Sequence, residues 1–185
     1  MVTDKISILP SNCRIAIAGT PVTLDNCNDL SGIDGVSGTI YYDPATKTLT
    51  LENATIDAGN RAPAIRHAIR DLTILLKGSN NIMGTGSTPT LEISTSTTIK
   101  GFGSLNIASA NECGIYITSS TLTIEDCTMN ITARWGIAGP TGSNPRENVV
   151  IRNAVVSAQG SDGSICDIAR LTLDRVAILS PAGAA

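Results

Sequence analysis

The residues best suited to acid–base chemistry are a single histidine and a scattered set of carboxylates. His67 follows Arg66 and could act as a general base, but the sequence offers it neither a nucleophile nor an orienting partner, so a packed or surface histidine is the preferred interpretation. Inverting glycosidases need two carboxyl groups about 6.5–9.5 Å apart. Glu92 has no acidic neighbour in its own strand file, although Glu112 or Asp167 could approach from a corner. We therefore predict no catalytic residue.

Metal-binding patterns are absent from the sequence. The five cysteines, at positions 13, 27, 113, 127 and 166, form no C-x-x-C pair and are remote from the histidine. This spacing argues against a structural zinc site, and small buried core residues are the simpler interpretation. Segment 162–167 lacks the regularly spaced acidic residues of a calcium loop. We predict no metal and no cofactor, and Cys13 with Cys27 is the pair to test for a disulfide.

Flat aromatic faces beside hydrogen-bonding side chains are the groups that could bind a sugar. The short strand that precedes each main repeat would point every second side chain outward. The resulting file of outward side chains includes Arg66, Glu92 and Tyr116. Trp135, with Arg134 before it, lies in a corner at one end of this file. We predict these five residues as the ligand-binding site, with corner packing as the alternative role of Trp135.

A repeated phrase must position these side chains. Its cleanest copy, residues 122–131, consists of a short alternating run, a polar corner and a second alternating run. Aligning the copies on the charged residue before the corner gives Glu52, Lys77, Lys100, Glu125, Arg152 and Asp174. Successive differences are 25, 23, 25, 27 and 22 residues, a period that indicates stacked supersecondary units. Three short strands per unit predict a parallel β-solenoid, because the signature of the rival leucine-rich repeat is missing.

Stacking turns equivalent positions into columns whose members lie about 4.8 Å apart. The charged column changes sign at four of its five steps, so we interpret it as structural rather than catalytic. Lys77 beside Lys100 is the exception. The next column consists of Asn53, Gly78, Gly101, Asp126, Asn153 and Arg175. Gly, Asn and Asp most readily adopt the left-handed backbone of a sharp corner, so Arg175 is the one departure from the pattern.

The beginning of the chain matches the repeat poorly. Segment 13–24 has the pattern of two short strands, and segment 38–51 that of a hairpin. A stacked array needs its first apolar face covered. We therefore assign residues 1–48 to an N-terminal cap and hairpin, and residues 49–185 to the coils of a single structural domain.

Composition and charge narrow the function. Of the 185 residues 42% are hydrophobic but only 3% aromatic, and Ile and Thr dominate, which favours strands with an aliphatic core. A net charge of -3 with no basic cluster gives no electrostatic footprint for nucleic acid. No apolar run approaches the roughly 20 residues of a membrane helix, so we expect no membrane span.

A three-strand coil with Asn or Gly at one corner resembles the single-stranded right-handed parallel β-helix of the pectate-lyase-like superfamily. A closer resemblance is to β-helical modules in large surface or secreted proteins of gut and anaerobic bacteria. The segments that show it are 17–23, 42–56, 72–82 and 99–107. It implies an all-β fold, a right-handed parallel β-helix of about six coils with an N-terminal β-hairpin cap. Some such relatives are described as carbohydrate-binding, whereas enzymes of this fold commonly use calcium-binding carboxylates that the outward file here does not supply.

The resulting expectation is a non-catalytic surface module that binds a polysaccharide, a surface glycan or another extracellular ligand. A structural spacer or adhesin module of a larger surface protein is one alternative, and a polysaccharide lyase or glycoside hydrolase is another. The N-terminus lacks the apolar stretch of a signal peptide, and the resemblance favours a mature fragment of a secreted or cell-surface protein over a cytosolic protein. Segment 180–185 has no obvious cap, so the last coil is expected to be exposed, to self-associate with another copy or to continue into a further domain.

Overall fold

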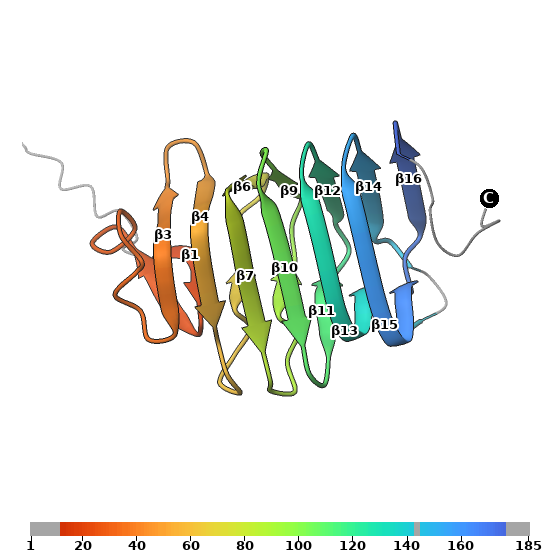
Figure 1. Cartoon of the computed structure of the whole chain (residues 1–185), viewed down its shortest axis with the longest axis horizontal. Helices are drawn as coiled ribbons and strands as arrows, with labels where there is room; N and C mark the ends of the chain where they lie inside the picture. Colours follow the sequence, from red (N-terminus) through yellow and green to blue (C-terminus); the bar gives the residue numbers. More distant parts are fainter. Residues whose placement is uncertain (1–11, 143–144, 177–185) are drawn as a thin grey trace, which may run out of the picture.

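The structure is a computed structural model that describes residues 12–142 and 145–176. All regular structure within these ranges is β-strand, in sixteen strands, with no helix. The strands wind into a parallel β-solenoid of about five turns (Figure 1). The predicted all-β class and solenoid architecture are therefore confirmed.

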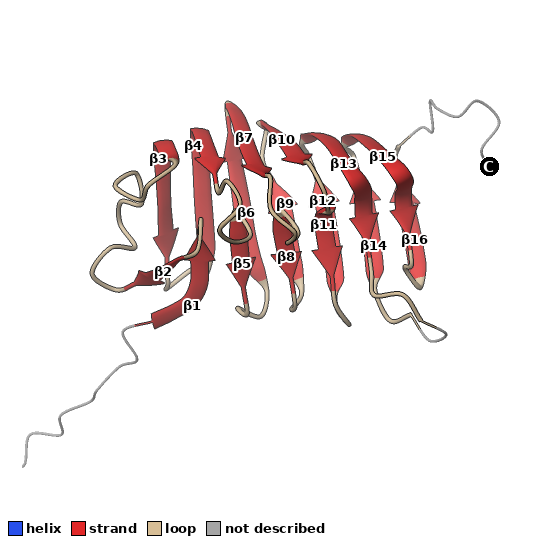
Figure 2. Ribbon diagram, turned by 90° about the horizontal axis from the view of Figure 1, so that it is seen from below, coloured by secondary structure: helices blue, strands red, loops and turns tan. Residues whose placement is uncertain are grey.

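Each coil contributes a strand segment to each of three faces (Figure 2). The first face contains the start of β4 (Thr48–Asp57), then β6 (Leu72–Lys77), β9 (Thr97–Lys100), β12 (Thr121–Glu125), β14 (Asn148–Arg152) and β16 (Arg170–Asp174). The second face contains the end of β4, then β7 (Ser79–Gly84), β10 (Ser104–Ser109) and the first parts of β13 (Thr128–Ala138) and β15 (Val155–Cys166). The third face contains β5 (Ile65–His67), β8 (Leu91–Ile93), β11 (Cys113–Ile117) and the second parts of β13 and β15.

Alternation along each strand builds the core. One inward position of the first face stacks from coil to coil as Leu49, Ile74, Ile99, Ile124, Ile151 and Leu173. The first four side chains are fully buried, whereas Leu173 in the last strand is 38% exposed. Each buried member removes apolar surface from water, which stabilises the fold by about 25 cal/mol per Å².

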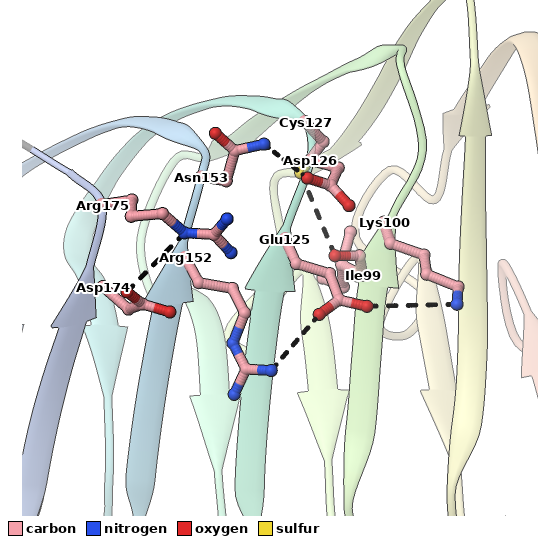
Figure 3. A network of polar contacts seen from close by, with 9 residues as sticks. All are labelled: Ile99, Lys100, Glu125, Asp126, Cys127, Arg152, Asn153, Asp174 and Arg175. Atoms are coloured by element: carbon pink, nitrogen blue, oxygen red, sulfur yellow. Dashed lines mark hydrogen bonds and ion pairs between the residues drawn. The ribbon is translucent and has the colours of Figure 1, made fainter.

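The corners between the first and second faces have the predicted left-handed backbone. All six residues of the corner column have positive φ: Asn53 (49°), Gly78 (64°), Gly101 (117°), Asp126 (54°), Asn153 (45°) and Arg175 (55°). Side chains of the column also join neighbouring coils, since Asn153 Nδ2 donates to Asp126 Oδ1 at 2.7 Å (Figure 3). Arg175 keeps the corner geometry although its Cβ makes this backbone costlier than for Gly, Asn or Asp.

The charged column is largely paired. Lys77 Nζ lies 3.5 Å from Glu52 Oε2. Lys100 Nζ lies 3.9 Å from Glu125 Oε1, and Arg152 Nη1 lies 3.8 Å from Glu125 Oε2 (Figure 3). Asp174 instead contacts its own neighbour Arg175, at 3.7 Å.

The predicted adjacency of Lys77 and Lys100 is wrong. The backbone register places Lys100 beside Leu75, because β6 continues for two more residues before its corner. The corner at Gly101 then folds tightly against the preceding coil, where a Cβ would lie 2.4 Å from the Leu76 carbonyl oxygen. This offset keeps the like charges of Lys77 and Lys100 out of register.

Antiparallel strands close the N-terminal end of the solenoid. β3 (Val36–Asp43) pairs with β4 in the predicted hairpin, and β1 (Asn12–Ile17) pairs with β5 and with β2 (Thr20–Thr23). The outer edge of β3 is occupied as well, because the Leu30 N–H donates to Ile40 O at 2.9 Å and the Tyr42 N–H donates to Cys27 O at 2.7 Å. We call β1, β2, β3 and the loop 24–35 the closed end.

The C-terminal end is different. Among the described residues, β16 pairs only with β14, and β15 pairs only with β13 (Figure 1). Leu171 is 43% exposed and Val155 is 62% exposed. We call β15 and β16 the open end. The coil count also differs slightly from the expected six, because β16 begins a sixth coil after about five complete turns.

Candidate functional site

The second face is an uncharged polar surface over four strands. The outward side chains of β7, β10, β13 and β15 are Ser79, Asn81, Met83, Ser104, Asn106, Ala108, Thr128, Asn130, Thr132, Val155, Ser157 and Gln159. They alternate with buried residues such as Ile82, Ile107 and Ile131. The first face, in contrast, carries the charged column. A neutral ligand that forms hydrogen bonds therefore fits the second face best.

An asparagine ladder runs along this face. Asn81, Asn106 and Asn130 are in register on β7, β10 and β13. Asn106 Nδ2 donates to Asn81 Oδ1, and Asn130 Nδ2 donates to Asn106 Oδ1, both at 3.0 Å. A side-chain amide has two N–H donors and two acceptor lone pairs, so the ladder leaves Asn106 one donor and one lone pair for a ligand.

Two surface cavities flank the second face, one at each of its corners. The larger, of about 510 Å³, is lined by Ser109, Ala110, Asn111, Thr132, Ala133, Arg134 and Ser161. The smaller, of about 280 Å³, is lined by Phe102, Gly103, Asp126, Cys127, Thr128, Asn153 and Val155. Thr128 and Thr132 thus line opposite cavities, and Asn130 lies between them on β13. Four residues of a strand span about 14 Å, the separation across which a ligand would extend.

Phe102 is the most exposed large hydrophobic residue of the described part of the chain, at 102%. It lies between Gly101 and Gly103, both of which pack closely on the preceding coil, so its ring is directed away from the core. Val155, which is 62% exposed, lines the same cavity. Phe102 and Val155 are therefore the two exposed apolar side chains that line the smaller cavity.

Three of the five predicted ligand-binding residues form a file on the third face, as expected from their spacing. Arg66 is in register with Glu92, and Glu92 with Tyr116. Arg66 Nε donates to Glu92 Oε2 at 2.7 Å, so these two groups already satisfy one another. Partial burial and nearby acidic groups raise the pKa of Tyr116, which keeps the phenol protonated. A role for this file in binding stays a prediction.

Arg134 and Trp135 lie in the corner where β13 turns from the second face to the third, at one end of that file. Trp135 is in register with Cys113 on β11, and the Arg134 guanidinium stacks 4.2 Å from the centre of its ring. Arg134 Nε also donates to Asp162 Oδ2 at 2.7 Å, and Arg134 lines the larger cavity. One ring face of Trp135 is therefore covered, which fits the corner-packing alternative, while Arg134 belongs to the second-face site.

His67 is a packed residue, as expected. It is 2% exposed; Nδ1 accepts from the Ile69 N–H at 3.4 Å, and Nε2 lies 3.0 Å from Thr97 Oγ1. Desolvation lowers the pKa of His67 to about 4, so the ring is neutral at physiological pH. It has no access to a substrate.

Glu147 is a buried carboxylate that the sequence did not single out. It is 1% exposed, and its two oxygens accept 2.7 Å hydrogen bonds from the Ser119 and Arg146 N–H groups. Burial opposes ionisation, but these bonds outweigh it and hold the pKa of Glu147 below its usual range. With both oxygens engaged by backbone, Glu147 anchors the loop after β13.

The remaining candidate groups are the possible metal ligands and the cysteines. Within residues 12–142 and 145–176, no three His, Cys, Asp or Glu side chains are grouped to hold a metal ion. All five cysteines are free, including the pair Cys13 and Cys27, whose disulfide stays a prediction. Burial raises the pKa of Cys113 and of Cys127 to about 11, so both are protonated thiols near neutral pH.

Comparison with protein-family models, curated proteins and solved structures finds no match. The described part of the chain contains no helix of the length and hydropathy that crossing a membrane requires.

The second face was not among the sequence-based predictions, although a signal for it exists. Asn81, Asn106 and Asn130 each precede an inward isoleucine, at intervals of 25 and 24 residues. An alignment on the charged column does not reveal them because the corners differ in length: they lie four, six and five residues after Lys77, Lys100 and Glu125. The exposure of Phe102 has no such signal, since it depends on how far the corner projects.

Proposed function

We propose that this chain is a non-catalytic carbohydrate-binding module of a secreted or cell-surface protein, with its ligand lying on the second face along β13. The observation that supports this best is the uncharged polar path from Thr128 through Asn130 to Thr132, which joins two cavities. Neutral sugars offer many hydroxyl groups and no charge, so free amide and hydroxyl groups match them. The resemblance to β-helical modules of bacterial surface proteins points the same way.

Each part of the site has a separate role in this proposal. The unpaired donor and acceptor groups of Asn106 and Asn130 bind sugar hydroxyls. Phe102 packs against the apolar face of a sugar ring, because an exposed aromatic ring gains most from covering C–H groups. Ser161 and Arg134 supply polar contacts in the larger cavity. The preferred ligand is an uncharged oligosaccharide, since Asp126 in the smaller cavity repels an acidic one.

The test is a broad glycan array followed by calorimetric titration with the best neutral ligand. Asn130→Ala and Phe102→Ala are expected to weaken binding about tenfold or more, a loss of at least one good contact. Asn148→Ala is the matched control, because it removes an asparagine side chain on the first face, away from the second-face site. Its affinity should stay close to that of the unmodified chain.

Other outcomes separate the alternatives. Loss of binding in Tyr116→Ala or Trp135→Ala, with Asn130→Ala unaffected, would place the ligand on the third face. No binding to any neutral or acidic glycan would overturn the proposal in favour of a structural spacer, a role that the paired charges and the asparagine ladder also suit. Release of unsaturated product from polygalacturonate with calcium present would instead identify a lyase.

A further inference from the structure

β16, whose outer edge has no neighbouring strand among residues 12–142 and 145–176, has a sequence that is complementary to itself in antiparallel pairing. The strand reads Arg170-Leu-Thr-Leu-Asp174, with a positive charge at one end and a negative charge at the other. Leu171 and Leu173 are in register with the buried Val149 and Ile151 and are therefore the inward residues. The outward residues are Arg170, Thr172 and Asp174.

The backbone of β16 fixes which groups are free. The Arg170 N–H donates to Glu147 O at 3.3 Å, and Asp174 O accepts from the Asn153 N–H at 3.0 Å, so these residues face the preceding coil. Alternate residues of a strand direct their backbone groups to opposite neighbours. The N–H and C=O groups of Leu171 and Leu173 therefore point to the side of β16 on which the described structure has no strand.

Only one antiparallel register satisfies both the backbone and the charges. Leu171 and Leu173 have to lie opposite residues whose backbone groups also point outward, which restricts the pairing to these two positions. Pairing Leu171 with Leu173 of a second copy puts Thr172 on the two-fold axis and Arg170 directly opposite Asp174 of that copy. Pairing Leu171 with itself puts Arg170 opposite Thr172 and leaves Asp174 opposite Ile168, and pairing Leu173 with itself puts Asp174 opposite Thr172 and leaves Arg170 opposite Val176. Opposite charges across strands stabilise their register.

We infer that β16 is a homodimerisation strand, which joins the open ends of two copies of this chain into one continuous sheet about a two-fold axis. Such an interface is isologous, since each copy contributes the same strand. It pairs the free backbone groups of the edge and covers Leu171 and Leu173, which are 43% and 38% exposed in the single chain. The closed end is a poorer partner because its loop already bonds groups of β3 (Ile40 O and Tyr42 N–H) and of β2 (Pro21 O and Thr23 N–H). This inference does not depend on carbohydrate binding.

Charge reversal tests the register, with the mass of the full chain followed by sedimentation velocity over a range of concentrations. The unmodified chain is expected to dimerise. R170D places two acidic side chains opposite each other twice in the dimer, and D174K does the same with two basic ones, so each should weaken dimerisation about tenfold or more. The double variant R170D/D174K restores opposite charges and should restore the dimer. Asp25, exposed at the closed end, provides the matched control D25K.

Each other result overturns the inference. A chain that stays monomeric shows that β16 does not pair between copies. A dimer that survives both single reversals is formed through a surface other than β16. A double variant no better than the single ones shows that Arg170 and Asp174 are not opposite each other. Hydrogen exchange of residues 170–174 should also slow as the concentration of the unmodified chain rises.

Discussion

The two ends of the solenoid solve the same problem differently. An uncovered end of a parallel solenoid exposes a strand edge with unpaired backbone groups and the apolar interior behind it. At the closed end, antiparallel strands and a loop cover both, and Leu30 and Ile40 are 1% exposed. At the open end, the equivalent stack finishes on Leu173 at 38% exposure. Within the described residues, the covered end is the one at which strands outside the repeat pack against the first coil.

This difference explains why the sequence of the first part of the chain does not match the repeat. Strands β1 and β3 run against the coil direction, so neither can use the repeat's corner residues. Their side chains instead fill the end of the core. The following four predictions test this contrast, and unfolding is to be measured at concentrations below those at which the chain associates.

Packing should give the largest contrast. Leu30→Ala removes a fully enclosed side chain from the closed end and should lower the free energy of unfolding by about 2–5 kcal/mol. Leu173→Ala, at the open end, should lower it by about 1 kcal/mol or less because the side chain is already partly hydrated. Urea unfolding of both variants measures the difference. Equal losses would mean that the two ends are equally well packed.

Acid should weaken the closed end selectively. His67 in β5 lies opposite Ile15 of the closing strand β1. Its pKa is about 4 when folded, against a usual value of 6.5, so between these values the unfolded chain binds a proton that the folded chain excludes. The free energy of unfolding should therefore fall by roughly 3 kcal/mol as the pH drops from 6.5 to 4, and His67 should add no further change below that.

The control for this effect is His67→Gln. Because His67 is the only histidine, this variant should lose the pH dependence between pH 6.5 and 5, where carboxylates contribute little. Hydrogen exchange should show acid-induced opening first in β1 and β5 rather than in β15 and β16. Opening that begins at β16 would contradict the assignment.

The corner column offers a smaller contrast. Asn53→Ala forces alanine into a left-handed backbone and removes the acceptor of the Ser79 N–H, so it should cost about 1–2 kcal/mol. Arg175→Asn, at the open end, should instead stabilise the chain by up to about 1 kcal/mol, since asparagine tolerates the same φ better. Thermal unfolding midpoints should shift in opposite directions; a loss of stability in both variants would be inconsistent with strain at Arg175.

Ion pairing should give the smallest contrast. Glu125→Gln should lower the free energy of unfolding by about 0.5–1 kcal/mol, because the Glu125 carboxylate lies 3.9 Å from Lys100 Nζ and 3.8 Å from Arg152 Nη1. Added salt should reduce this loss. Asp174→Asn should leave the stability of the monomer unchanged because its partner Arg175 is 70% exposed. Urea titrations at low and high salt distinguish the two positions.

Much of the fold was predictable from single positions of the repeat. The corner residues were recognisable because few residue types accept a left-handed backbone, and Asn53 and Asn153 recur where the chain must turn. The hairpin was recognisable from its alternation on both sides of a turn. These signals are local, so one sequence is enough to show them.

Features that depend on unequal corner lengths were not predictable. Asn80 occupies an inward position that is Leu105 and Met129 in the next coils, yet it is fully buried. Its amide accepts from the Ala54 N–H and donates to the Lys77 and Ser104 carbonyl oxygens. Only the three-dimensional corner shows these partners. For the same reason the candidate site, which lies between two corner cavities, could not be predicted from the spacing of its residues.

The placement of the closed end at the beginning of the chain also bears on synthesis. Because the N-terminal part of a protein leaves the ribosome first, the closed end and first coil, within residues 12–67, are available before the later coils exist. Each new coil then meets a finished strand edge about 25 residues upstream, a short loop closure that favours rapid folding. A solenoid closed only at its C-terminal end would expose both edges until translation was complete. The growing chain therefore exposes one unpaired strand edge at a time, and the next coil pairs with it.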